Sequence, residues 1–168
     1  MTEFNDFHRP FRGNDLEWRI QRSGKTSKGS LWAIIVPYLT SRAVMDRLDE
    51  VVGGGRWQDT YDVIDKGFIC HLMVQCGDHW ISKSDGAPET NIENIKGGIS
   101  DSFKRAAVKW GMGRDLYQCP TIYAEFVERN HPGAQYLKID NVTHYWAVPQ
   151  DADEKIPVSP LYKKNPNT

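Results

Sequence analysis

The sequence predicts an α+β domain in which a curved antiparallel sheet packs on one long helix and carries a basic β-hairpin. Three observations lead to this class. Short apolar or aromatic stretches bounded by turn-forming residues recur along the chain, as in antiparallel strands. Two longer stretches have helical periodicity, and the predicted order is strand, strand, helix, three strands, helix. A sheet of this kind buries one face, and the second helix is long enough to cover it.

The two ends of the chain are expected to lie outside this domain. Residues 1–15 are polar and contain Pro and Gly, which favours an N-terminal arm. The domain itself is expected over residues 16–149. Residues 150–168 are polar and rich in proline, which predicts a disordered tail.

The first predicted elements are a hairpin and a helix. Residues 16–22 and 30–37 are strand-like and are joined by a turn-rich, basic segment. Thr40 or Ser41 can cap a helix that extends to residue 52, because either side chain can accept a hydrogen bond from a free backbone N–H. The charged residues of this helix, including Arg47, are expected to face solvent. Three glycines end it.

Further strands and the long helix follow. Three strand-like segments predict a meander with short turns: residues 56–64, 67–75 and 79–84. The long helix is predicted over residues 89–112, with Lys104 and Arg105 on the side opposite its apolar stripe. The stripe consists of Ile92, Ile95, Ile99, Phe103, Ala106 and Trp110. One more strand-like stretch covers residues 136–148.

Charge is segregated along the chain although the total is close to zero. The net charge is −1 and the pI is about 6.5. Residues 9–28 contain six basic residues against two acidic ones, and residues 104–114 contain four basic residues against none. If the fold brings these two segments together they form a positive groove, and the alternative is two separate solvated faces.

The rest of the composition indicates a cytoplasmic protein. No apolar run approaches the ~20 residues of a membrane span, and the N-terminus lacks the pattern of a signal peptide. The three cysteines leave an odd one over, which favours reduced thiols. We therefore expect the cytoplasm of a bacterium or of a phage-infected cell, and no membrane partner.

Three catalytic or metal-binding interpretations find little support. Gly24-Lys25-Thr26 looks like part of a phosphate-binding loop, but Arg19 stands where the first glycine is required and a strand follows. A zinc site could be formed by Cys70, His71, Cys76 and His79, but neighbouring residues of a strand point to opposite faces. A metal-dependent nuclease could use Asp78, Asp85 and Glu89, which also fit a turn and an acidic helix start. We expect no cofactor, no metal and no enzymatic activity.

The basic end of the long helix is more informative. Lys104, Arg105 and Lys109 could simply complement the helix dipole. However, adjacent Lys104 and Arg105 form a doubly cationic ridge, which suits a sequence-independent grip on successive phosphates.

Three segments resemble the Rad52 superfamily of single-strand annealing proteins, including phage Sak-type members. The run SDSFKRAAVKWGMGRDLY is similar to the helix motif of that family, VMDRLDEVVGGGRWQDTY is similar to its first helix and the following strand, and the basic hairpin matches in order. The resemblance covers roughly residues 16–117. It implies a subunit that assembles into a ring or an open arc, with a positive groove that holds one DNA strand by its backbone with the bases turned outward.

The resemblance also implies which residues contact DNA. Lys104 and Arg105 match the paired basic residues of the family's helix. Arg22 matches an arginine at the end of the first strand, with Arg19 as the alternative. Lys25 and Lys28 fall in the hairpin, and Lys109 extends the basic helix face. A single-strand-binding protein or an exonuclease is a further candidate partner.

Together these features predict ATP-independent binding of single-stranded DNA and annealing of complementary strands in recombination and repair. Two alternatives from other classes remain at this point. One is the metal-dependent nuclease described above. The other is a non-catalytic oligomeric domain that uses its aromatic residues at an interface.

Overall fold

The computed structural model of the chain describes residues 4–89 and 94–163. The strands are β1 (Leu16–Lys25), β2 (Leu31–Leu39), β3 (Trp57–Ile64), β4 (Gly67–Cys76), β5 (His79–Pro88), β6 (Ile122–Tyr123), β7 (Glu125–Phe126), β8 (Gln135–Ile139) and β9 (Val142–Ala147). The α-helices are α1 (Ser41–Val52) and α2 (Asn94–Trp110), and short 3-10 helices are η1 (Asn5–His8), η2 (Gly13–Asp15), η3 (Arg114–Gln118) and η4 (Asp153–Lys155).

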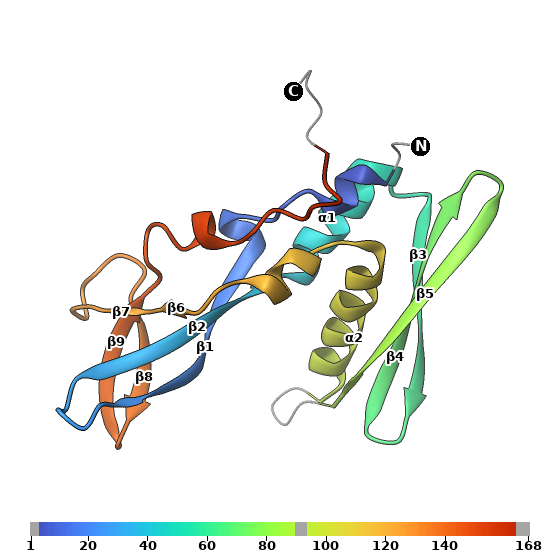
Figure 1. Cartoon of the computed structure of the whole chain (residues 1–168). Helices are drawn as coiled ribbons and strands as arrows, with labels where there is room; N and C mark the ends of the chain where they lie inside the picture. The colour runs from blue at the N-terminus through green and yellow to red at the C-terminus, as the bar shows by residue number, and fades with distance from the viewer. Residues whose placement is uncertain (1–3, 90–93, 164–168) are drawn as a thin grey trace.

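The α+β class with antiparallel strands is confirmed, but the expected single curved sheet on one long helix is not found. The described strands form three separate sheets, with the orders β1-β2-β6, β3-β4-β5 and β7-β9-β8. Figure 1 shows α2 with the second sheet on one side and the other two sheets on the opposite side. The hairpin and the meander do not pair with each other, and α2 lies between them (Figure 1).

Helix α1 begins and ends where the sequence predicts. The Thr40 hydroxyl accepts a hydrogen bond from the Ala43 N–H (3.0 Å), and Gly53 ends the helix with a φ of 85°. The expectation that Arg47 faces solvent is wrong, since its side chain is buried and donates to the carbonyl oxygens of Asp6 and Arg9. The N-terminal segment crosses α1 at this position and covers it.

The N-terminal segment is part of the core and does not form a separate arm. Phe7 and Phe11 are buried in the cluster that α1, α2 and β4 share. The Phe11 ring lies under the Arg47 guanidinium, 4.0 Å from its centroid. Two aromatic residues in a polar stretch are enough to anchor it.

Residues 150–163 also pack against the body, although their composition predicts disorder. Ala152 and Ile156 are buried, and Asn5 exchanges two hydrogen bonds with Lys163, each of 3.0 Å. Polar neighbours in the sequence conceal these two apolar anchors. The remainder of the predicted tail, residues 164–168, lies outside the described residues.

Helix α2 covers the inner face of the second sheet. Phe103, Ala106 and Trp110 of the predicted stripe are buried, whereas Ile95 is 65% exposed. Ile95 lies in the first turn, before the point where Gly98 packs against the Phe68 ring. The predicted helix start at residue 89 is wrong, because Glu89 directly follows β5 and donates its N–H to the Lys66 carbonyl oxygen. The stripe position Ile92 lies outside the described residues.

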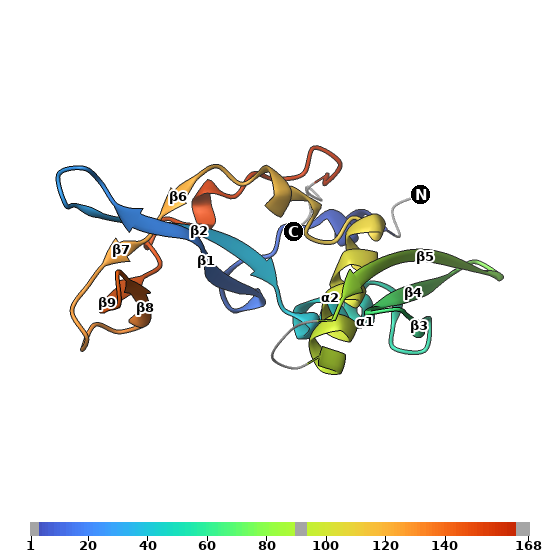
Figure 2. The same cartoon turned by 90° about the horizontal axis from the view of Figure 1, so that it is seen from below.

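The segment after α2 differs most from expectation. The single strand predicted over residues 136–148 is a hairpin of β8 and β9, whose turn residues Asp140 and Asn141 both have positive φ. These dihedral angles are typical of a type I′ hairpin turn. The hairpin packs on one face of the first sheet. Trp146 of β9 lies there with Ile35 of β2 and Ile122 of β6 in a second core. Figure 2 shows the third sheet on one side of the β1–β2 hairpin.

Candidate nucleic-acid interface

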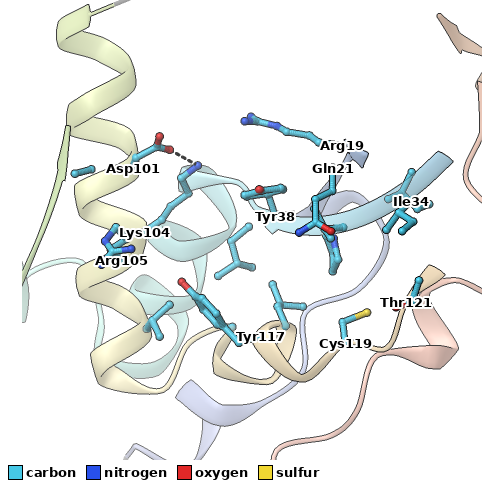
Figure 3. A pocket seen from close by; sticks show the side chains of 18 of the residues that line it. Arg19, Gln21, Ile34, Tyr38, Asp101, Lys104, Arg105, Tyr117, Cys119 and Thr121 are labelled. Carbon is cyan, nitrogen blue, oxygen red and sulfur yellow. Dashed lines mark ion pairs between the residues drawn. The ribbon is translucent and has the colours of Figure 1, made fainter. Parts of the chain in front are cut away.

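A groove with a volume of about 710 Å³ lies between the first sheet and α2 (Figure 3). Strands β1 and β2 form one wall, α2 forms the other, and the segment after α2 completes the lining. Its polar and aromatic lining includes Arg19, Gln21, Tyr38, Asp101, Lys104, Arg105 and Tyr117. Arg19 of the first basic segment and Lys104 and Arg105 of the second therefore line one groove.

A β-bulge places a second arginine on the groove-facing side of the hairpin. Arg19 pairs with Val36 and Arg22 pairs with Ile34, because the register of β1 shifts between Ile20 and Arg22. Residues two apart on β2 share a face, so Arg19 and Arg22 lie on the same face although they are three residues apart. The Arg19 guanidinium lies over the Tyr38 ring, 5.1 Å from its centroid, and is paired with Glu17 at 2.7 Å.

The other two cations expected on the hairpin lie elsewhere. Lys25 pairs with Leu31 in the register, on the face that packs against the third sheet. Its ammonium group forms an ion pair with Asp140 of the β8–β9 turn at 3.1 Å. Lys28 lies in the turn at the exposed tip of the hairpin. The structure therefore separates Lys25 and Lys28 from the groove.

Lys104 is the most enclosed cation of the helix wall. Its side chain is only 16% exposed and forms an ion pair with Asp101, one turn earlier, at 3.0 Å. Figure 3 shows it extending from α2 into the space that faces Tyr38 and Arg19. Lys104 thus does not lie on a solvated far side of the helix, because the hairpin forms a wall opposite it.

Arg105 and Lys109 are tied to the second sheet. Arg105 donates a hydrogen bond to Asp85 Oδ1 at 3.1 Å. The Lys109 ammonium donates a hydrogen bond to the Ser84 carbonyl oxygen and lies 3.8 Å from Asp85 Oδ2. Burial alone would raise the pKa of Asp85, but the Gly86 N–H, Arg105 and Lys109 together hold that pKa below its ordinary value. Arg105 still lines the groove, whereas Lys109 lies toward β5 and outside its lining.

Sequence reasoning missed several groove residues. Tyr38 and Tyr117 line the groove and are 44% and 71% exposed. Alternation along β2 places Tyr38 on the face of Val36 and Ile34, so the strand pattern could have identified it. The partnership of Asp101 with Lys104 follows from their spacing of three residues on a helix.

The remaining candidates have structural roles. Cys70 is buried against α2, and burial raises the pKa of its thiol to about 11. His71 lies on the other face of β4, as alternation predicts, and bonds Ser84 and Asp62. No group of three or more His, Cys, Asp or Glu side chains arranged to hold a metal occurs in residues 4–89 and 94–163.

The Gly24-Lys25-Thr26 triplet lies in a β-hairpin, and no helix follows it directly. Gly24 and Lys25 end β1, and the turn that begins at Thr26 leads into β2. Within the described part of the chain, no helix has the length and apolar character required to span a bilayer.

The chain is similar to a family of DNA repair proteins and to two bacterial DNA-binding proteins. The sequence profile of the Rad52/22 family of double-strand break repair proteins matches residues 4–133, which contain both walls of the groove. The single-stranded DNA-binding protein DdrA of Deinococcus deserti is 29% identical over 113 residues, which are 66% of this chain and 54% of that protein. DdrA of Deinococcus radiodurans is 30% identical over 119 residues, which are 70% of this chain and 55% of that protein.

The chain thus spans about half the length of these curated relatives. No solved structure matches it. The family profile covers well over half of the chain, from the N-terminal segment through β7, and ends before β8. The chain belongs to the Rad52/22 family of double-strand break repair proteins.

Proposed function

We propose that this protein binds single-stranded DNA in the groove between the first sheet and α2, and that it anneals complementary strands without nucleotide hydrolysis. One observation carries the proposal. Arg19 and Lys104, which are 85 residues apart in sequence, line the same groove from opposite walls. Membership of a double-strand break repair family and similarity to two DdrA single-stranded DNA-binding proteins support it.

The charges explain how such a groove holds a strand. Lysine and arginine neutralise phosphates and release condensed counterions, so binding is largely independent of sequence and weakens with salt. Arg22 extends the row of cations along the hairpin, and Arg105 extends it along α2. Annealing itself is downhill, so the protein needs only to keep strands extended and close together.

We further propose that copies assemble into a ring or an arc. A single groove offers few phosphate contacts, and a row of subunits multiplies them along one strand. The family resemblance supports this arrangement, as it supports a single-strand-binding protein or an exonuclease as a partner. Both bacterial relatives support a place of action in the cytoplasm.

The test is to replace Lys104 and Arg105 together by Ala. Single-strand binding should weaken, and the slope of log affinity against log salt should become shallower by about 0.7 for each phosphate that the variant no longer neutralises. Fluorescence anisotropy with a labelled oligonucleotide over a series of salt concentrations measures both quantities. Strand annealing, followed by the signal of a paired fluorophore and quencher, should slow in parallel.

Lys155→Ala is the matched control, since Lys155 is an exposed cation in an ion pair with Asp151, outside the groove. It should leave affinity and slope unchanged. Equal binding by the double variant and the wild-type protein, with the circular dichroism spectrum unchanged, would refute the proposed groove. Cleavage of the oligonucleotide that depends on added Mg²⁺ would favour the nuclease instead.

A further inference from the structure

The first sheet has two faces with different surroundings. One face is covered by the β8–β9 hairpin, and its residues Ala33, Ile35 and Ile122 are buried. The other face begins in the groove at Tyr38 and continues toward the tip of the hairpin. It carries an unusual combination of arginine and aromatic side chains.

The register places these side chains in rows across the sheet. Ile34 of β2 pairs with Arg22 on one side and with Tyr123 of β6 on the other, so these three residues lie side by side. Tyr123 is 58% exposed, and Arg22 is exposed as well. The row of Arg19 and Val36 lies one step closer to the groove.

Trp32 forms the next row toward the tip. It pairs with Gly24, and a Cβ on Gly24 would lie 3.0 to 3.3 Å from three atoms of the indole. The ring of Trp32 therefore lies across β1 at a position where glycine leaves room for it. Its partial exposure leaves part of the indole available on the same face as Tyr123.

This combination fits one ligand chemistry. Arginine binds phosphate, and exposed aromatic rings stack with unpaired bases of any sequence. An apolar face without cations would fit a protein partner equally well. Here Arg19 lies over the Tyr38 ring, and Arg22 shares a row with Tyr123. The face is also continuous with the groove, since Ile34, Val36 and Tyr38 belong to the groove lining.

We propose that the strand leaving the groove continues along this face, with a phosphate at Arg22 and bases stacked on Tyr123 and Trp32. The inference rests on the proposed single-strand binding and adds a contact to bases, beyond the grip on the backbone. Tyr38 and Arg19 mark its inner end, and Trp32 marks its outer end. The occupant is therefore the unpaired bases of the same strand.

Tyr123→Ala tests the stacking step, with Tyr123→Phe as the conservative variant. The alanine variant should bind a single-stranded oligonucleotide about tenfold more weakly, since stacking on one ring contributes on that scale. The phenylalanine variant keeps a ring and should bind as the wild-type protein does. With an oligonucleotide of equal length in which abasic sites replace the bases, all three proteins should bind alike.

Tyr136→Ala is the matched control. Tyr136 is a tyrosine of β8 that is 73% exposed and pairs with Tyr145, on the face of the third sheet directed away from its core. This variant should bind both oligonucleotides normally. A second readout is the intrinsic fluorescence of Trp32, because quenching on addition of oligonucleotide should be smaller in Trp32→Phe than in the wild-type protein.

Two results would overturn the inference. One is equal affinity of Tyr123→Ala and the wild-type protein for the intact oligonucleotide. The other is a smaller particle mass of Tyr123→Ala by light scattering, which would show that a second copy of the chain covers this face. If Lys104→Ala weakens binding while Tyr123→Ala does not, only the stacking contact fails. If the wild-type protein does not bind at all, the proposed function itself fails.

Discussion

Asp101 lies in the groove lining beside Lys104, where a phosphate of the bound strand is expected. Its side chain is 44% exposed and holds the lysine at 3.0 Å. Arg19 has Glu17 as a similar neighbour at 2.7 Å. We predict that Asp101→Asn tightens single-strand binding about two- to fivefold, because a phosphate then meets Lys104 without a competing carboxylate, and screened competition of this kind is on the scale of about 0.2–1 kcal/mol. Anisotropy titration at fixed salt measures the change.

Asp151→Asn is the control for this prediction. Asp151 pairs with Lys155 at 2.9 Å, so the variant loses the same charge from a more exposed lysine–aspartate pair that lies outside the groove. Tighter binding by Asp101→Asn alone would show local competition. An equal gain in both variants would contradict it, since net charge would then explain the whole effect.

At the scale of secondary-structure elements, η1 ends in His8, a partly buried histidine near the cations Arg114 and Lys83. The His8 ring packs against Gly111, where an added Cβ would overlap it. Burial lowers the pKa of His8, and the charges of Arg114 and Lys83 lower it further, while Asp115 opposes them. The folded protein therefore holds His8 neutral to a lower pH than the unfolded chain does.

This difference predicts that stability falls as pH decreases. The unfolded state takes up the proton near pH 6.5 and the folded state only below that, so stability is lost from about pH 6.5 down through the lowered pKa. One proton changes the free energy of unfolding by at most about 1.4 kcal/mol per pH unit. In His8→Gln this part of the pH dependence should disappear.

Denaturant unfolding at several pH values measures the dependence. His131→Gln is the control, because His131 is exposed. A slope in His8→Gln as steep as that of the wild-type protein would assign the pH dependence to other groups.

The boundaries and faces of these elements differ in how far the sequence predicts them. The cap at Thr40 and the glycine end of α1 are local signals, and both strands of the hairpin follow from apolar runs. The face on which Arg22 or Lys25 lies depends on a register shift in β1, which no local pattern reveals. Asp140 and Asn141 form a polar pair between apolar residues, and such a pair favours a two-residue turn, so this hairpin could have been predicted from the sequence.

At the scale of the whole molecule, the groove has one wall on each of two cores. The first core joins α1, α2 and β4 to the N-terminal segment, and the second lies between the first and third sheets. Trp18 and Cys119 pack against both. The sequence predicts the two charged segments, but their meeting depends on how the two cores are joined, which involves contacts between distant residues.

This arrangement predicts that a core substitution can destabilise one wall of the groove and leave the other wall stable. Trp146 is 2% exposed in the second core, and its replacement by Ala should lower the free energy of unfolding by about 3–5 kcal/mol. Hydrogen exchange should then increase in β1, β2, β6, β8 and β9 while α2 stays protected, because α2 packs in the first core. Single-strand binding should weaken, since the hairpin wall loses its support.

Trp110→Ala should show the reverse pattern. Trp110 is 6% exposed in the first core and donates its indole N–H to the Leu72 carbonyl at 3.2 Å, so exchange should increase in α2 and β4. The milder variants Trp146→Phe and Trp110→Phe should give the same two patterns with smaller amplitude, which keeps the comparison informative if an alanine variant does not fold. Uniform loss of protection in both phenylalanine variants would mean that the cores unfold as one unit. Separate patterns would show that each wall of the groove is stabilised by its own core.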